Sequence, residues 1–191
     1  VDITENLSLQ DFYKTDTHWK QENLIDVAEK IATQMGTDIK TEYEVKTLDK
    51  DFYGVYYGQS ALPLEAEKIK YFTNNTLENC KVYDYQNSKE ISVYDMEKAY
   101  GKDPYEMFLS GSLSLITIEN ENAKTDKELV IFRDSFGSSI APLFVEGYKK
   151  VTLVDIRYIH PDMLEKYIEF DNQDVLFLYS TSVLNNSETI K

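Results

Sequence analysis

Two short segments of the sequence hold residue types that could act together in nucleophilic catalysis. The first, residues 15–19, reads Thr-Asp-Thr-His-Trp and contains one of the two histidines and the only tryptophan. If this segment is extended, Asp16 and His18 project to the same side, because strand side chains repeat every two residues. A carboxylate beside an imidazole can fix its tautomer and stabilise the imidazolium, as the acid of a Ser-His-Asp triad does. A plainer interpretation is a capped helix start with Trp19 in the core.

The second segment, residues 133–139, reads Arg-Asp-Ser-Phe-Gly-Ser-Ser and lies between a predicted apolar strand and a predicted helix. A turn from strand to helix at the carboxyl edge of a parallel sheet is where α/β proteins place their ligands. There the hydroxyl of Ser135 would be exposed, and the backbone N–H groups that follow could stabilise an oxyanion. The alternative is that Asp134 and Ser135 only start the helix.

The elements that would hold these segments follow from the spacing of apolar residues. Helical spacing predicts a helix over about residues 20–35, and Gly36 is a suitable stop. After Pro104 the pattern alternates between strands and helices, which is typical of βαβ units. The predicted strands cover residues 113–118, 129–132, 151–154 and 175–179, and the predicted helices cover residues 138–148 and 161–170.

The strands at residues 129–132 and 175–178 are continuously apolar. Continuous hydrophobicity is typical of strands buried on both faces of a parallel sheet that helices cover. Residues 39–103 differ, since they are rich in Tyr, Thr and Asn and contain alternating pieces typical of short antiparallel strands. The sequence therefore predicts a single α/β domain over residues 1–191, with a β-rich insertion at about residues 39–103.

Composition limits the partners and the class of the protein. The chain of 191 residues carries 20 basic and 34 acidic side chains, which gives a formal net charge of −14. Nucleic acid and anionic membrane surfaces require a basic face, so we expect neither as a partner. No apolar run approaches the roughly 18 residues that span a bilayer, so we expect no direct membrane insertion. Cys80 is the only cysteine, which excludes an intramolecular disulfide and a zinc site built from cysteines.

The first residues of the sequence are Val-Asp-Ile-Thr, with neither an initiator methionine nor a signal-peptide pattern. We therefore expect a fragment whose native N-terminus has been removed.

Taken together, the two segments resemble the DHHW protein family, which is similar in turn to the alginate O-acetylation proteins AlgX and AlgJ of the SGNH hydrolase-like superfamily. The resemblance rests on Asp-Thr-His-Trp after Phe-Tyr-Lys-Thr, on Arg-Asp-Ser-Phe-Gly-Ser-Ser, and on Val-Asp-Ile-Arg-Tyr further downstream. Phe52-Tyr53-Gly54 also resembles a family element. The resemblance implies a three-layer α/β/α, flavodoxin-like fold with a mainly parallel sheet and a permuted order of motifs, in which acid and base precede the nucleophile.

Residue by residue, the resemblance implies that Asp16 is the triad acid, His18 the base and Ser135 the nucleophile. Relatives are expected to have Gly-Gly-Asn where this sequence has Ser-Gly-Ser at residues 110–112. The backbone of Gly111 or Ser112 could complete the oxyanion hole, although the Ser112 side chain is a poor replacement for Asn. Loss of one such donor can cost about 10²–10³ in rate.

Three further residues are substrate-binding candidates. Arg157 and Tyr158 follow the predicted strand at residues 151–154, where Arg157 could hold a carboxylate or acyl oxygen or form a structural salt bridge. Trp19 could stack on a sugar ring beside His18 or lie in the core. His160 precedes a predicted helix, and we interpret it as a neighbour of the helix start, although it is the rival of His18 as base.

We therefore expect a serine-dependent acyl-ester enzyme that acts on carbohydrate, either an O-acetyltransferase or an acetylesterase of bacterial cell-surface polysaccharide or exopolysaccharide. The resemblance implies the substrate, an extracytoplasmic location, and a membrane acyl donor or polysaccharide-assembly proteins as possible partners. An acyl-serine mechanism requires no metal or organic cofactor. The alternative is a catalytically weak or inactive SGNH-like module that binds carbohydrate or serves as a scaffold in a polysaccharide assembly system.

Overall fold

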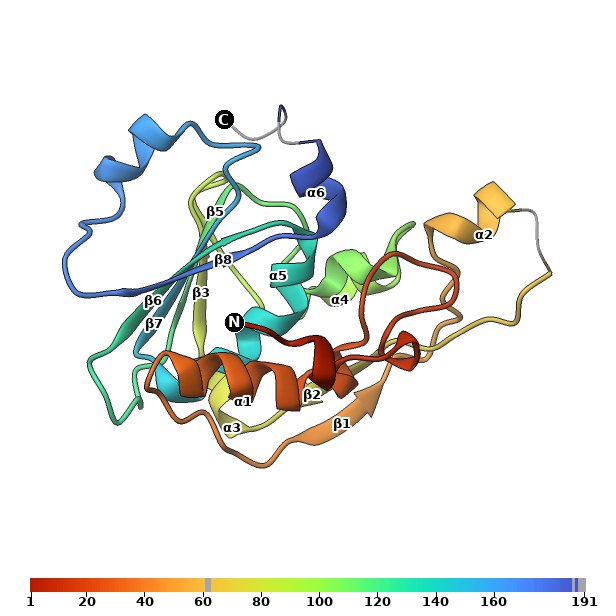
Figure 1. Cartoon of the computed structure of the whole chain (residues 1–191), viewed down its shortest axis with the longest axis horizontal. Coiled ribbons are helices and arrows are strands. Elements are labelled where there is room, and N and C mark those ends of the chain that lie inside the picture. The colour runs from red at the N-terminus through yellow and green to blue at the C-terminus, as the bar shows by residue number, and fades with distance from the viewer. Residues whose placement is uncertain (61–62, 187, 189–191) are drawn as a thin grey trace.

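A six-stranded mixed sheet forms the centre of the computed structural model, which describes residues 1–60, 63–186 and 188 (Figure 1). Its strands are β3 (Lys81–Asp84), β4 (Lys89–Ile91), β5 (Leu115–Glu119), β6 (Glu128–Arg133), β7 (Lys150–Val154) and β8 (Asp174–Leu178), in the spatial order β4-β3-β5-β7-β6-β8. Strand β6 is parallel to β7 and to β8. Strand β5 is antiparallel to β7, and β3 is antiparallel to both β4 and β5.

The other elements surround this sheet. A second, two-stranded antiparallel sheet pairs β1 (Glu44–Thr47) with β2 (Lys70–Thr73). The α-helices are α1 (Ile25–Gln34), α2 (Val55–Ser60), α3 (Asn75–Asn79), α4 (Met96–Ala99), α5 (Ser135–Ile140) and α6 (Thr181–Asn185). The 3₁₀ helices are η1 (Thr4–Asn6), η2 (Leu9–Asp11), η3 (Gln21–Asn23), η4 (Pro104–Met107), η5 (Ala141–Gly147) and η6 (Pro161–Lys166). In the part of the chain that the structure describes, no helix is both long and apolar enough to cross a membrane.

The α/β class predicted from the sequence is confirmed, and β5 to β8 lie close to their predicted positions. Gly36 follows α1 with a φ of 67°, the left-handed conformation expected of a helix stop. The helix predicted over residues 138–148 is instead α5 followed by the 3₁₀ helix η5, which has Pro142 in its first turn. The helix predicted over residues 161–170 is the shorter 3₁₀ helix η6.

The expectation of a mainly parallel sheet is corrected, because three of the six strands run antiparallel to their neighbours. The chain between β5 and β6 is only residues 120–127 and holds no helix. A parallel connection requires a crossover of about a dozen residues or more, so this short loop reverses the chain instead. Residues 39–103 supply the small sheet and also contribute β3 and β4 to the main sheet.

The main core lies on one face of the large sheet. There a single buried cluster joins α1, α5 and η5 to the inward side chains of β5, β6 and β7. On the opposite face, Leu164 and Ile168 from η6 and the residues after it form a smaller cluster with Leu115, Val130 and Val154. The apolar strand β6 is therefore covered on both faces, as its sequence predicts.

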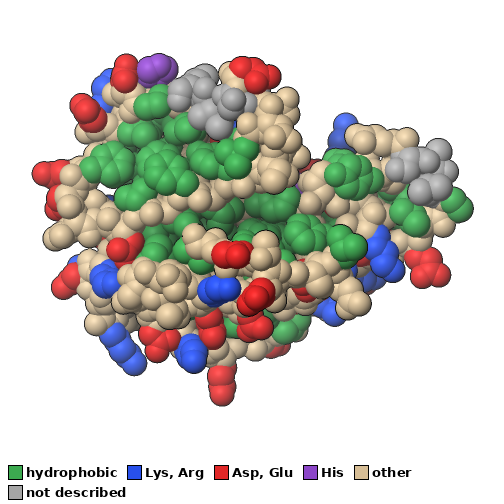
Figure 2. Space-filling model, in the orientation of Figure 1, with side chains coloured by type: hydrophobic (Ala, Val, Ile, Leu, Met, Phe, Trp, Pro, Cys, Tyr) green, Lys and Arg blue, Asp and Glu red, His purple; other side chains and the backbone are tan. Residues whose placement is uncertain are grey.

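Strand β8 does not have the double burial predicted for it. It lies at the edge of the sheet and pairs with β6 alone. Val175 is 45% exposed and Phe177 is 68% exposed, although the Phe177 ring stacks on Phe132 at 4.8 Å. Hydrophobic side chains accordingly gather over β8 on the face shown in Figure 2. A continuously apolar strand sequence does not show whether other elements cover the strand. Here the elements that cover β6 do not extend over the edge strand β8.

Candidate active site

Ser135 lies in the turn from β6 into α5. Asp134 caps this helix, because its Oδ1 accepts a hydrogen bond from the Phe136 amide at 3.0 Å. The Oδ2 of Asp134 accepts a second bond, from the Ser180 amide at 2.7 Å. Asp134 is buried by these contacts, whereas Ser135 is half-buried. The turn is thus tied to two segments and presents Ser135 at the carboxyl end of the parallel strands.

His18 brings the two sequence segments together across 117 positions of the chain. Its Nε2 lies 2.7 Å from the Oγ of Ser135, and its Nδ1 lies 2.5 Å from the Oδ1 of Asp16. An ionised carboxylate can only accept, so the Nδ1–H of His18 donates to Asp16. The Nε2 is then left to accept a hydrogen bond from the Ser135 hydroxyl. This is the hydrogen-bond pattern of an acid, a base and a nucleophile.

The segment that holds Asp16 and His18 is a bend, not the extended chain that would place both side chains on one side by alternation. The Oδ1 of Asp16 also accepts the amide of His18 at 3.1 Å, which closes a turn of the kind that Asp side chains favour. An antiparallel bridge between Phe12 and Trp19 closes the loop at its base. Asp16 and His18 therefore meet because the carboxylate folds back over its own turn, rather than through strand alternation.

Asp16 is nearly buried and still held in its charged form. It is 5% exposed, and its Oδ2 accepts the amide of Val55 at 3.0 Å. Burial acts to raise the pKa of Asp16, but the hydrogen bonds from the His18 ring and the Val55 amide outweigh burial, so this pKa lies below its usual value. The carboxylate is thus ionised at neutral pH and can hold the imidazole in one tautomer.

Gly54 packs directly against Asp16 and leaves no room for a side chain. A Cβ at this position would lie 2.3 Å from the Cβ of Asp16 and 2.4 Å from the carbonyl oxygen of Thr15. The amide of Gly54 donates to the Thr15 hydroxyl at 3.0 Å, which joins the start of α2 to the bend. The Phe-Tyr-Gly element singled out in the sequence is therefore the support of Asp16.

A buried aromatic network supports the imidazole. The ring of Tyr105 stacks on His18 with 3.9 Å between centroids and 15° between planes. The Tyr105 hydroxyl and the indole Nε1 of Trp19 each donate to the Oγ of Ser139 at 2.8 Å. Trp19 is only 4% exposed, so the expectation that it stacks on a sugar ring is wrong. Nothing in the sequence pattern indicated the role of Tyr105, because its segment carries no motif.

The loop that precedes β5 has an unusual backbone. The φ angles of Leu109, Ser110 and Gly111 are 52°, 57° and 82°, all in the left-handed region. This conformation costs roughly 1–2 kcal/mol for a residue with a side chain. The amide of Gly111 already donates to the carbonyl of Phe108 at 3.1 Å. The expectation that the Gly111 amide supplies an oxyanion donor is therefore corrected. The Ser112 amide remains the candidate donor in this loop.

Arg133 holds this loop against α5. Its side chain is fully buried, and its Nη2 donates to the carbonyls of Gly111 at 3.3 Å and Leu113 at 3.1 Å. Its Nη1 donates to the Oγ of Ser138 at 3.1 Å and lies 3.9 Å from the Asp155 carboxylate. Burial lowers the pKa of Arg133, and Asp155 opposes this shift. Sequence reasoning gave Arg133 no role, although it stands in the same motif as Ser135.

Two of the other predicted residues, Arg157 and Tyr158, lie beside Asp155. Arg157 binds this buried carboxylate through Nε at 2.8 Å and Nη2 at 2.6 Å, which is the structural salt bridge considered as its alternative role. Its guanidinium lies 5.3 Å from the ring centre of Tyr158, which is 54% exposed. His160 caps the start of η6, so His18 is the imidazole beside Ser135.

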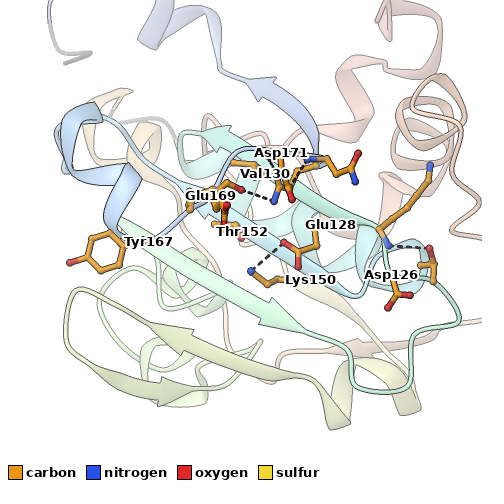
Figure 3. Close-up of a pocket in the computed structure, with 13 residues that line it drawn as sticks. Asp126, Glu128, Val130, Lys150, Thr152, Tyr167, Glu169 and Asp171 are labelled. Atoms are coloured by element: carbon orange, nitrogen blue, oxygen red, sulfur yellow. Dashed lines mark hydrogen bonds and ion pairs between the residues drawn. The ribbon is translucent and has the colours of Figure 1, made fainter.

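A hollow of about 850 Å³ lies at the opposite, amino-terminal ends of β6 and β7 and contains none of these residues. Figure 3 shows its polar lining, which includes the ion pair between Glu128 and Lys150 at 3.2 Å. Gln173 in the same lining donates to the carbonyl of Glu169 at 2.9 Å. The candidate site is therefore identified by the contacts among Asp16, His18 and Ser135, and not by the volume of a hollow. Among the described residues, no group of three or more His, Cys, Asp or Glu side chains is placed to hold a metal ion.

Solved structures share this fold. A DHHW family protein from Eubacterium siraeum is 22% identical, with a TM-score of 0.74 over 94% of this chain and 62% of that chain. Bacillus cereus PatB1 with a sulfonyl adduct is also 22% identical, with a TM-score of 0.70 over 95% of this chain and 65% of that chain. A second PatB1 structure is 22% identical, with a TM-score of 0.67 over 94% of this chain and 67% of that chain.

The chain thus spans less than two thirds of the DHHW family protein and about two thirds of PatB1. No family model and no curated protein matches the sequence. Identity of 22% shows the fold and not the activity. The similarity to the DHHW family expected from the sequence is confirmed at that level: this chain is folded like a DHHW family protein and like Bacillus cereus PatB1.

Proposed function

We propose that this chain is a serine-dependent acyl-ester enzyme that acts on carbohydrate outside the cytoplasm. Its reaction would transfer or remove an O-acyl group, in the simplest case acetyl, on a cell-surface or secreted polysaccharide. The observation that carries the proposal is the line of contacts from Asp16 through His18 to Ser135, at 2.5 Å and 2.7 Å. The family resemblance supports three further parts of the proposal: the carbohydrate substrate, the location, and an acyl donor supplied by membrane or assembly proteins.

In the acylation step, the Oγ of Ser135 attacks the ester carbonyl while its proton passes to the Nε2 of His18. Asp16 stabilises the imidazolium that forms. The amides of Ser112 and Ser135 would donate to the oxyanion of the tetrahedral intermediate. The ester C–O bond then breaks, and His18 returns the proton to the departing alcohol oxygen.

In the deacylation step, His18 takes a proton from an incoming hydroxyl, which attacks the acyl-Ser135 carbonyl. Attack by water makes the enzyme an esterase, and attack by a sugar hydroxyl makes it a transferase. The Ser135–acyl bond breaks, and His18 returns the proton to the Oγ. The cycle requires no group besides the chain and its two substrates.

Exposed tyrosines beside the triad favour a carbohydrate ligand. The rings of Tyr53 and Tyr57 lie 4.5 Å apart, and the side chains are 47% and 37% exposed. They flank Gly54, which packs against Asp16. Exposed aromatic faces suit sugar rings, because the apolar body packs while the hydroxyl stays hydrated. The same observation supports a second candidate function, a carbohydrate-binding or scaffold module in which Ser135 is unreactive.

Covalent labelling with phenylmethylsulfonyl fluoride separates these two functions. The enzyme proposal predicts sulfonylation of Ser135, located by peptide mass spectrometry, because the serine is activated by His18. The His18→Ala variant should label at least about 100-fold more slowly. Unlabelled Ser135 in folded protein, or equal labelling of the variant, would overturn the enzyme proposal and favour the binding module.

The Gly54→Ala variant tests whether close packing by Gly54 holds the Asp16 carboxylate in place. The added Cβ would displace the Asp16 carboxylate from His18, so we expect kcat for p-nitrophenyl acetate to fall by about 10²-fold, the typical cost of a misplacement near 1 Å. Gly58→Ala is the matched control, because a Cβ there meets nothing within 4 Å. Equal activity of the two folded variants would show that Asp16 needs no such support.

A further inference from the structure

An open groove of about 750 Å³ begins beside the nucleophile and is lined by apolar side chains. Ser135 and Phe136 line it together with two other parts of the chain. One wall is the N-terminal segment with Ile3, Leu7 and Phe12, and the other is β8 and α6 with Leu176, Leu178 and Val183. Figure 2 shows the hydrophobic side chains as a band between β8 and α1.

The side chains of this groove are anchored to the core and open on the outside. Ile3, Leu7, Phe12, Phe136, Leu176 and Leu178 are partly buried and pack against the main core cluster. Of the described residues that line the groove, only Asp134 has a charged side chain. That carboxylate is 1% exposed and accepts the amides of Phe136 and Ser180, so it presents no free charge. The groove therefore has two apolar walls, and hydroxyl groups from Tyr179, Ser180, Thr181 and Ser182 also line it.

The groove is continuous with the triad. Thr17 and Tyr56 belong to its lining, and each is a neighbour of the acid–base bend. Thr17 lies between Asp16 and His18, and the amide of Tyr56 donates to the carbonyl of Thr15 at 2.9 Å. A group that occupies the groove would therefore lie close to the carbon that Ser135 attacks.

We propose that this groove binds the hydrocarbon chain of the acyl group, and that the substrate ester carries an acyl chain longer than acetyl. This inference rests on the proposed function. The two apolar walls suit a hydrocarbon chain better than a sugar, because they cannot hydrogen-bond to its hydroxyl groups. Each buried CH₂ of an acyl chain contributes about 0.8 kcal/mol. A volume of about 750 Å³ suits a drug-sized group, since such pockets measure roughly 300–1,000 Å³, and two acetyl carbons would leave most of it empty.

The chemistry stays balanced for a longer acyl group. The Oγ–acyl bond of Ser135 forms as the ester C–O bond breaks, and the proton moves through His18 to the leaving alcohol. Only the position of the chain differs, because its methylene groups lie along Phe136 and the two walls. The exposed tyrosines near α2 remain available to the alcohol part of the ester.

A chain-length series tests the inference. We expect kcat/KM for p-nitrophenyl octanoate to exceed that for the acetate by at least about tenfold, because the longer chain gains burial. Val183→Trp should lower the octanoate-to-acetate ratio by about tenfold, since it fills the groove from α6. The matched control is Leu184→Trp, because Leu184 is the adjacent helix residue, is 54% exposed and does not line the groove. This control should keep the wild-type ratio.

The outcomes distinguish the inference from the function on which it rests. Absence of turnover for every ester would overturn the proposed function itself. Turnover that needs Ser135 but favours acetate would overturn only the acyl groove and indicate that another group fills it. An octanoate preference unchanged in Val183→Trp would place the chain elsewhere. If that variant does not fold, Leu7→Trp blocks the groove from the opposite wall and has the same expected effect.

Discussion

Replacing Ser135 with alanine is expected to lower kcat for p-nitrophenyl acetate by at least about 10³-fold. The variant loses the only hydroxyl that the structure places on His18 Nε2 within the described residues, so no acyl-enzyme can form. Oxyanion stabilisation and substrate binding persist, and they set the residual rate. Steady-state kinetics with the buffer rate subtracted, on protein of confirmed fold, provide the measurement.

Two comparisons make this result specific. Ser92→Ala is the matched control, because Ser92 is an exposed serine outside the described groove and triad, and its activity should stay at the wild-type level. The double variant Ser135→Ala/His18→Ala should be no slower than either single variant, since the two residues act as one unit. Retention of a tenth or more of wild-type activity in Ser135→Ala would refute the nucleophile assignment.

Arg133→Met is the second change with a large expected effect. Methionine fills a similar volume but leaves the carbonyls of Gly111 and Leu113 without their donor. Loss of charged hydrogen bonds in a fully buried site should lower the free energy of unfolding by about 3 kcal/mol. The left-handed loop would then relax, so we expect kcat to fall by about 10²-fold, the typical cost of one oxyanion donor, with little change in KM.

A separate comparison shows whether Arg133 positions the loop or only stabilises the fold. Arg133→Lys keeps the charge but cannot reach two carbonyls with a planar fork. We expect it to recover much of the stability, measured by urea unfolding, and little of kcat. A variant whose kcat recovers together with its stability would show that Arg133 has a structural role alone.

The polar motifs could be predicted because their residues are neighbours in sequence. Asp16 and His18 are two residues apart, and the Asp16 side chain closes a turn onto the His18 amide. Asp134 and Ser135 follow an apolar strand, and local capping chemistry fixes their turn. These turn and capping contacts join residues only a few positions apart, so the local sequence is enough to predict them.

The edge of the sheet and the supports of the site could not be predicted in this way. The sequence of β8 is continuously apolar over residues 175–178, like that of β6 over residues 129–132. Phe177 is nevertheless exposed, because β8 lies at the edge of the sheet. The sequence allowed Trp19 to be a core residue, as a lone tryptophan most often is, or a sugar platform, and its buried contact with Ser139 decides for the core. Tyr105 and Arg133 carry no signal of their roles, because each acts on residues distant in the chain.

The residue types alone indicated the α/β class and singled out Asp16, His18 and Ser135 as candidate acid, base and nucleophile. The contact of His18 with Ser135 across 117 positions, and the hydrogen bond that occupies the Gly111 amide, became visible in the folded chain alone. The groove beside Ser135 was likewise invisible in the sequence. The difference lies in range. Capping, turns and strand propensity act within a few residues, whereas the sheet order and the packing of α5 against the loop before β5 arise from burial summed over the whole chain.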